Sequence, residues 1–309
     1  MMNKIKKIIS KLFEIILPFV DRMAYLRYFN QPFTDLPKSN LQTYRELAEG
    51  AERNTYSIED VDFLEKKNGY AVNRDWLNSL AFHTQIVVKE SELNYAHGRV
   101  LYATLRNYLT TLDQDSKTVN IVETGTARGF SALCMAKALY DAGYEGSICT
   151  VDVLPHYKKM YWNCAADHTK GEQIRHDLLG DWTDLAERYI IFIQGYTKHI
   201  LPKIALPRIN FAFLDGAHTY EDVMFEFNNI SKRQKKGDIV VFDDYNEKSF
   251  PGIIKAVKYI SSEMKYNIEL VHNKNTLRDY VIAKKNNYFV ERKIIFFNSP
   301  AFLILLKNL

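Results

Sequence analysis

The chain has 309 residues, of which 47% are hydrophobic and 13% aromatic, so it can form one large domain or a domain with an appendage. Its 41 basic and 37 acidic residues give a net charge of +4, and no glycine-arginine tract or aromatic-basic repeat occurs, which argues against a nucleic-acid-binding protein. The three cysteines, Cys134, Cys149 and Cys164, lack metal-type spacing and are typical of a reducing compartment. We therefore expect a globular, cytoplasmic protein.

The N-terminal segment at residues 4–20 places apolar residues at helical spacing with lysines between them, which predicts an amphipathic basic helix. Lys11 and Glu14 interrupt the apolar run, so the segment is neither a signal peptide nor a membrane-spanning helix. Two interpretations stay open: packing against the domain or a partner subunit, which we favour, and peripheral contact with a membrane surface. The apolar C-terminal segment at 293–306 allows the same two interpretations.

Residues 21–115 show helical periodicity with breaks at Pro32, Pro37 and Gly69. Together with the basic N-terminal segment they predict a helical N-terminal extension at residues 1–115, which we expect to contribute to substrate, oligomer or membrane contacts. The pattern changes after residue 118, where apolar runs typical of buried strands begin to alternate with helical segments. We place a second domain at residues 116–285 and an apolar C-terminal extension at 286–309.

The second domain is predicted to be an α/β domain with a Rossmann-like, mostly parallel sheet of seven strands, covered by helices on both faces. The last two strands are separated by only a short loop, so we expect an antiparallel hairpin at one edge of the sheet. The predicted strands are 119–123, 147–153, 189–194, 209–215, 238–243, 267–272 and 279–283. The predicted helices are 130–143, 172–188, 196–203, 219–233 and 250–264.

The most informative stretch is the loop between the first strand and the first helix, at residues 123–131. Gly125 allows a backbone conformation barred to other residues, and Gly129 is suited to a close approach of a ligand to the main chain. Amides at the start of the following helix then face an anionic or polar group. Glu123, at the strand end, is placed to accept hydrogen bonds from such a ligand. This loop alone is a weak signal, because many nucleotide-binding folds use a similar turn.

Acidic residues end four of the predicted strands: Glu123, Asp152, Asp215 and the pair Asp243-Asp244. In a sheet of this kind the ligand binds at the carboxyl ends of the strands, where the strand order reverses, and an acid at the end of the second strand receives a ribose diol. Any one of these acids could be a helix cap or a loop residue, but four together indicate a site. The dinucleotide fingerprint G-x-G-x-x-G fails, because positions 127 and 130 are Ala and Phe, which argues against NAD.

The arrangement resembles class I S-adenosylmethionine-dependent methyltransferases, in particular the metal-dependent O-methyltransferase branch with the catechol and macrocin O-methyltransferases. The resemblance covers roughly residues 119–284. It is carried by Glu-Thr-Gly-Thr-Ala-Arg-Gly-Phe-Ser at 123–131, Thr-Val-Asp at 150–152, Phe-Leu-Asp-Gly-Ala-His-Thr-Tyr-Glu-Asp at 213–222 and Lys-Gly-Asp-Ile-Val-Val-Phe-Asp-Asp-Tyr at 236–245. The last two blocks are the more specific ones.

The resemblance implies S-adenosylmethionine as cofactor. Its methionine part would be held by the loop, its ribose by Asp152, and its adenine would lie near Gln194. The residues implied as cofactor-binding are Glu123, Gly125, Thr126, Gly129, Ser131, Asp152, Gln194 and Asp215.

The resemblance also implies a divalent metal bound by Asp215, Asp243 and Asp244. The chemistry agrees, because carboxylates that converge at the ends of neighbouring strands repel one another unless a cation neutralises them. Oxygen ligands select Mg²⁺ or a similar cation. The alternative is that Asp243 or Asp244 caps the following segment.

His218 lies three positions after Asp215, where catechol-type enzymes place the basic residue that accepts the substrate proton, and a neutral imidazole can do so near neutral pH. Helix capping or metal binding by His218 stays open. The implied reaction is metal-assisted methyl transfer to a hydroxyl of a sugar, glycoside or related small molecule, with an aromatic diol as the second choice of acceptor. We keep two rival functions, a hydroxylase or oxidoreductase on the same fold and a non-catalytic assembly protein, and we expect a homo-oligomer. His83, Tyr95, His97, Arg99 and Tyr245 are candidates for the acceptor pocket, although each taken singly fits a core or surface role better.

Overall fold

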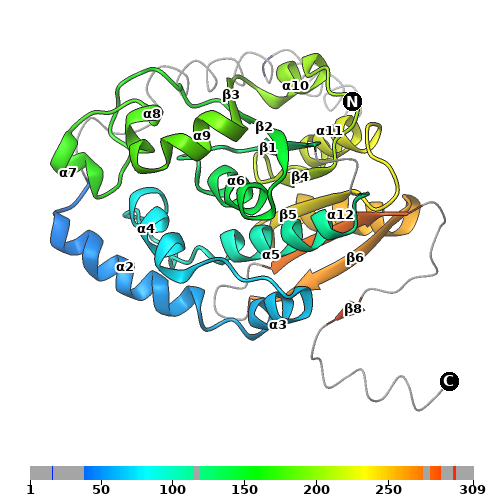
Figure 1. Cartoon of the computed structure of the whole chain (residues 1–309), viewed down its shortest axis with the longest axis horizontal. Helices are drawn as coiled ribbons and strands as arrows, with labels where there is room; N and C mark the ends of the chain where they lie inside the picture. Colours follow the sequence, from blue (N-terminus) through cyan, green and yellow to red (C-terminus); the bar gives the residue numbers. More distant parts are fainter. Residues whose placement is uncertain (1–15, 17–37, 114–117, 274–278, 287–294, 297–309) are drawn as a thin grey trace, which may run out of the picture.

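The computed structural model describes Ile16 and residues 38–113, 118–273, 279–286 and 295–296 (Figure 1). Most of the predicted amphipathic helix at 4–20 and most of the apolar segment at 293–306 lie outside these ranges, as do the predicted breaks at Pro32 and Pro37. No helix within the described ranges is long and apolar enough to cross a bilayer. The boundaries proposed for the two extensions stay predictions.

The sheet contains all seven predicted strands and a two-residue addition at its edge. The strand order is β3-β2-β1-β4-β5-β7-β6-β8. β1 to β5 are parallel neighbours in this order, whereas β7 is antiparallel to both β5 and β6, so the predicted hairpin is confirmed. The strands are β1 (Thr118–Thr124), β2 (Glu145–Asp152), β3 (Ile190–Gln194), β4 (Phe211–Leu214), β5 (Ile239–Tyr245), β6 (Tyr266–Val271), β7 (Asp279–Lys285) and β8 (Ile295–Phe296).

The sheet is buried on both faces because alternate side chains of its central strands enter two separate cores. In β4, Phe211 and Phe213 belong to one core, and Ala212 and Leu214 belong to the other. The first core is closed by α5 (Ala96–Thr110), α6 (Phe130–Ala142) and α9 (Thr183–Tyr189), and the second by α11 (Tyr220–Ser231) and α12 (Pro251–Glu263). This two-sided burial is the reason the strands read as continuous apolar runs in the sequence.

Four helices precede the sheet and confirm the helical character of the part of the N-terminal extension that the structure describes: α2 (Leu41–Thr55), α3 (Glu59–Asn68), α4 (Arg74–Thr84) and α5. Asn40 and Asn73 cap the starts of α2 and α4 with side-chain hydrogen bonds, and Gly69 ends α3 in the left-handed conformation. α5 lies close to α6 at Gly98, where a Cβ would lie 2.7 Å from the Phe130 ring. The extension therefore shares one hydrophobic core with one face of the sheet.

The helix predicted at 172–188 is wrong as a single element. The segment forms α8 (Arg175–Leu178), a 3-10 turn at Gly180–Trp182 and α9, after the short α7 (Ala166–Lys170). Gly180 breaks the helical pattern, and Trp162 and Leu178 form a small core of their own below this segment. The helix predicted at 196–203 is likewise divided into α10 (Thr197–Ile200) and a 3-10 turn at Leu201–Lys203, because Pro202 lacks the amide proton that a continuing helix needs.

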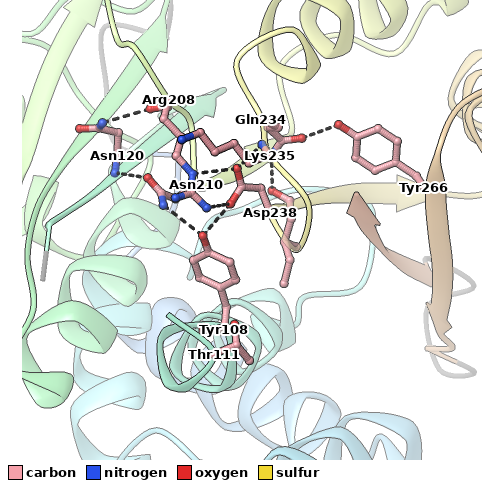
Figure 2. A network of polar contacts seen from close by, with 10 residues as sticks. Tyr108, Thr111, Asn120, Arg208, Asn210, Gln234, Lys235, Asp238 and Tyr266 are labelled. Atoms are coloured by element: carbon pink, nitrogen blue, oxygen red, sulfur yellow. Dashed lines mark hydrogen bonds and ion pairs between the residues drawn. The ribbon is translucent and has the colours of Figure 1, made fainter. Parts of the chain in front are cut away.

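A polar network joins α5 to the amino ends of β4 and β5 (Figure 2). The Asp238 carboxylate, which is fully buried, accepts hydrogen bonds from the Tyr108 hydroxyl at 2.7 Å and from Arg208 Nη2 at 2.7 Å and Nε at 3.1 Å. It also accepts the backbone N–H of Lys235 at 2.6 Å, and Asn210 donates to the Tyr108 hydroxyl at 3.1 Å. We call these residues the amino-end network.

Candidate cofactor and active site

The strand order reverses between β1 and β4, because β2 and β3 continue the sheet on one side of β1 whereas β4 and β5 continue it on the other. A cavity of about 180 Å³ opens at the carboxyl ends of these strands, where ligands bind in folds of this kind. It brings together the loop after β1, the acids that end β4 and β5, and the start of α5. Its lining includes Gly125, Thr126, Ala127, Ser131, Asp215, Asp243, Asp244 and His97.

The turn after β1 needs glycine at position 125 for two reasons. Its φ is +89°, and a Cβ there would lie 2.2 Å from the carbonyl oxygen of Asp215, which has no room to move. Gly129 also has a positive φ, of +94°, but the space beside it is filled by the Leu179 side chain at 3.0 Å, so the protein occupies the place that the sequence suggested for a ligand. Ala127 is held at φ +45°, a conformation that costs energy for a residue with a side chain.

Glu123 lies beneath this turn and is fully buried. One of its carboxylate oxygens accepts a hydrogen bond from the Ser131 hydroxyl, and the other accepts one from Thr150 at 2.5 Å. Burial raises the pKa of Glu123 to about 7, although both hydroxyl donors lower it. The geometry makes Glu123 a support that fixes Ser131 at the start of α6. Thr126 shares this arrangement through a hydrogen bond to Thr150.

Asp152 ends β2 next to the turn, as expected, and is partly exposed. Its carboxylate accepts backbone N–H groups from Ala127 at 2.5 Å and from Leu154 at 2.8 Å, so it fixes the turn, and it is not among the residues that line the cavity. Gln194 is the register partner of Asp152 on β3, and its amide donates to the Val153 carbonyl at 3.3 Å. Asp152 and Gln194 thus lie side by side at one end of the sheet.

Arg175, on α8, is a residue of this site that the sequence did not indicate. Its side chain is almost fully buried, and its Nε donates to the Ala127 carbonyl at 3.0 Å, opposite the bond that Asp152 makes to the Ala127 N–H. Burial lowers the pKa of Arg175 to about 10, and the nearby Asp152 and Glu123 oppose that change. Its Nη2 has no hydrogen-bond partner among the described residues. No spacing in the sequence connects position 175 to the turn, because an irregular segment carries it there.

Three of the predicted catalytic and metal-binding residues form one cluster. Carboxylate oxygens of Asp215 and Asp244 and a ring nitrogen of His218 lie within 4.8 Å of one another, and His218 Nε2 is 3.2 Å from Asp244 Oδ2. Asp244 is held at a positive φ of +55°, so its backbone departs from the regular strand conformation in which side chains alternate between the two faces of the sheet. Asp243 lines the same cavity, but its Oδ1 accepts the backbone N–H of Asp244 at 2.7 Å.

His218 is fixed by its neighbours and does not cap the helix that follows it. Thr219 is the N-cap of α11, and its hydroxyl accepts the N–H of Asp222 at 3.2 Å. The His218 ring stacks on Phe250 with ring centres 4.2 Å apart. The loop also lies against α12, where a Cβ at Gly252 would lie 2.3 Å from the His218 carbonyl oxygen. The imidazole is thus held in place toward the two acids.

Two further buried residues, Glu226 and His97, lie close to the site. Glu226, on α11, is almost fully buried, accepts a hydrogen bond from Thr124 at 2.9 Å, and has a pKa that burial raises to about 7. His97 lies between the rings of Phe130 and Phe213, and burial lowers its pKa to about 4, so it is neutral near pH 7. The sequence did not indicate Glu226 as a site residue, because its position resembles that of any acid on an amphipathic helix.

Of the candidates for the acceptor pocket, His97 lines the cavity. Arg99 instead pairs with Asp62 and Glu65, and the Tyr95 hydroxyl donates to Asn78 at 2.8 Å. The remaining two candidates, His83 and Tyr245, are not part of the cavity lining that the structure describes. A structural role thus accounts for Arg99 and Tyr95.

Comparison with known proteins finds a family model that matches part of the chain. Residues 122–245 match the family model described as "Methyltransferase domain". An uncharacterized protein of Acanthamoeba polyphaga mimivirus is 28% identical over 165 residues, which is 52% of this chain and 66% of that protein, just under two thirds of its length.

Two solved structures similar to this chain are the O-methyltransferase TomG from Streptomyces achromogenes, in complex with S-adenosylmethionine, and an O-methyltransferase from Bacillus cereus in complex with S-adenosylhomocysteine. TomG has a TM-score of 0.47 and 16% identity over 70% of this chain and 92% of its own. The Bacillus cereus protein has a TM-score of 0.46 and 14% identity over 74% and 90%. The turn at Gly125, the acid at Asp152 and the Asp215–Asp244 cluster all lie within the residues that match the family model. Residues 122–245 of the chain thus match a methyltransferase domain.

Proposed function

We propose that this protein transfers a methyl group from S-adenosylmethionine to a hydroxyl oxygen of a sugar, glycoside or related small molecule, with the help of a divalent cation. One observation carries the proposal: the cavity that contains the turn at Gly125 is also lined by Asp215 and Asp244, and the Nε2 atom of His218 lies 3.2 Å from the Asp244 carboxylate behind this lining. A cofactor cradle and a group that can activate a hydroxyl thus open into one space. Proximity of two bound reactants is worth several kcal/mol in such reactions.

The residues around the turn suit S-adenosylmethionine. Ser131 is oriented by Glu123 at the start of α6, where amides point toward a ligand. Asp152 is partly exposed at the end of β2, where it can accept ribose hydroxyls. Arg175 carries a buried Nη2 without a partner among the described residues, so this side of the cradle offers an unused donor. The bound cofactor supplies an electrophilic methyl group.

The acids of the cluster suit a divalent cation. Asp215 and Asp244 offer hard oxygen ligands, which select Mg²⁺ or a similar ion, and Asp243 is the third carboxylate at the same edge. A bound cation would neutralise the acids and lower the pKa of a substrate hydroxyl. In this proposal His218 Nε2 accepts the proton of the substrate hydroxyl. Phe250 and Gly252 fix the position of His218, and an Asp244 carboxylate oxygen lies 3.2 Å from Nε2.

Polar side chains in the lining of the cavity support the proposed class of acceptor. The segment between α4 and α5 contributes Gln85, Lys89, Glu92 and Asn94 to the lining. These four side chains offer several hydrogen-bond donors and acceptors, and the aromatic rings of the lining are those of His97 and Tyr280. A polyhydroxylated acceptor matches the four polar side chains, which supports a sugar or glycoside.

The test is the formation of S-adenosylhomocysteine from S-adenosylmethionine with Mg²⁺ present, over a panel of glycosides and a matched panel of aromatic diols. The proposal expects turnover with one or more glycosides and calorimetric binding of S-adenosylhomocysteine to the free protein. Binding of NAD in place of S-adenosylhomocysteine would favour the oxidoreductase alternative. Cofactor binding with turnover of aromatic diols alone would overturn the acceptor class and leave the reaction type in place.

A further inference from the structure

A second and larger cavity, of about 580 Å³, lies at the opposite end of the sheet from the active site. It opens beside the amino-end network, between the end of α5 and the amino ends of β4 and β5. Asn267 at the start of β6 and Lys284 and Lys285 at the end of β7 form its other wall. Its volume is in the range of small-molecule sites, and the proposed reaction does not use it.

Positive charge dominates this cavity. Arg208, Lys236, Lys284 and Lys285 line it, with Asp113 as the acid among the lining residues. With Asp113 and the buried Asp238 also counted, these four basic groups leave an excess of two positive charges. Because a concave wall concentrates the field of such charges, an anion is attracted to this space.

Two of the basic groups are already engaged, and two are available. Arg208 is held by Asp238 through Nε and Nη2, and Lys285 donates to the Ser231 carbonyl. The ammonium groups of Lys236 and Lys284, in contrast, make no hydrogen bond or ion pair with any residue that the structure describes, and both side chains are exposed. They are point charges that can turn toward a ligand.

Hydrogen bonds of the amino-end network fix the residues on one side of this cavity (Figure 2). The fully buried Asp238 fixes Arg208 on one side, Tyr108 on another and the Lys235 N–H on a third. Arg208 therefore needs no reorganisation to present the rest of its guanidinium group to the cavity. Preorganised donors of this kind bind anions with a smaller loss of entropy than flexible side chains do.

We propose that this cavity binds a phosphate-bearing anion. Arginine and lysine are the residues that recognise phosphate groups, and the amide side chain of Asn267 adds a neutral donor at the same wall. The phosphate belongs either to a soluble molecule or to the headgroup of a lipid, and both present the same chemistry to Lys236 and Lys284. The proposal does not depend on the methyltransferase reaction.

The test is calorimetric titration of the full chain with inorganic pyrophosphate, in the wild type and in the double variant Lys236→Ala with Lys284→Ala. The matched control is Lys66→Ala with Lys203→Ala, which removes two exposed lysines that are not among the residues lining the cavity. Loss of two charged donors should weaken binding by about tenfold or more, whereas the control should bind like the wild type. Equal weakening in both double variants would show a general charge effect and would overturn the site.

Vesicles distinguish the two sources of phosphate. Co-sedimentation is compared for vesicles of phosphatidylcholine alone and of phosphatidylcholine with phosphatidic acid. Binding to phosphatidic acid that the Lys236/Lys284 variant loses supports a lipid headgroup in the cavity, and pyrophosphate binding without vesicle binding supports a soluble ligand. Absence of pyrophosphate binding, together with vesicle binding that is absent or unchanged in the double variant, would contradict the proposal.

Discussion

The two ends of the sheet treat buried acids in opposite ways. At the amino end, Asp238 is matched by the Arg208 guanidinium, a tyrosine hydroxyl and a backbone N–H. At the carboxyl end, Glu123 is matched by the neutral hydroxyls of Ser131 and Thr150, and its pKa rises to about 7. One end satisfies its charge from within the fold, whereas the other holds a carboxyl group whose protonation changes near neutral pH. The difference indicates that the amino end contributes stability and that the carboxyl end is arranged for a ligand.

The amino-end pair should show the largest effect on stability. Asp238→Ala leaves the half-buried Arg208 guanidinium, the buried Tyr108 hydroxyl and the Lys235 N–H without their acceptor, and each buried group left unpaired costs about 1 to 3 kcal/mol. Urea unfolding measures the free energy of unfolding directly. Asp181→Ala, at an exposed acid on the surface, is the control and should change it by less than about 0.5 kcal/mol. A loss below about 1 kcal/mol for Asp238→Ala would show that the network does not hold this end together.

At the carboxyl end the comparison predicts a pH dependence. The pKa of Glu123 is raised from 4.5 to about 7 in the folded protein, so the folded state binds this proton more tightly than the unfolded state. Its contribution to stability is fully present below pH 4.5 and is lost as the pH rises to about 7, by about 3 kcal/mol in total. Glu123→Gln should remove this slope. Glu226, whose pKa is also about 7, is present in both proteins and cancels in the difference.

Urea unfolding of the wild type and of Glu123→Gln at several pH values from 4 to 8 tests this prediction. The difference in unfolding free energy between the two proteins should change steadily across the window given above. Parallel curves would mean that Glu123 ionises with an ordinary pKa despite its burial, and the two ends would then differ less than the structure indicates.

The cofactor side of the carboxyl end gives the next effect. Asp152→Ala removes an acceptor for ribose hydroxyls and the bond to the Ala127 N–H, and we expect S-adenosylhomocysteine affinity to fall by about 2 kcal/mol. Calorimetry gives this change directly. Asp177→Ala, an exposed acid on α8, is the control and should bind like the wild type. Unchanged binding in Asp152→Ala would refute the assignment of Asp152 to the cofactor.

The sequence predicted most of the sheet because two-sided burial leaves long apolar runs, and it predicted the acids at the strand ends because four of these runs stop at one. It could not predict how the segment at 153–182 folds, since short turns with little periodicity carry Arg175 to the Ala127 carbonyl. The amino-end network was equally invisible, because Tyr108 and Asp238 are separated by 130 positions and meet only through the strand order. Local pattern thus predicts elements, whereas the support of the site depends on contacts between distant segments.

The roles within the carboxyl-end cluster show the same limit. The positions of these acids at the ends of two strands predicted that Asp215, Asp243 and Asp244 lie at one edge of the sheet. All three line the same cavity in the structure. It did not predict the positive φ of Asp244, which places its carboxylate beside His218 while Asp243 bonds to the backbone. A single unusual backbone angle therefore decides which carboxylates face each other.

The most direct test of the central claim is methyl transfer to an identified acceptor in the presence of EDTA, followed by restoration of Mg²⁺, with S-adenosylhomocysteine binding measured in the same solutions. If Asp215, Asp243 and Asp244 hold a cation that activates the hydroxyl, chelation abolishes transfer, leaves cofactor binding mostly intact, and Mg²⁺ restores activity. Asn at any one of the three positions should then raise the Mg²⁺ concentration needed for activity. Full activity in chelator would contradict the account, because the three carboxylates would then serve the substrate or the fold directly.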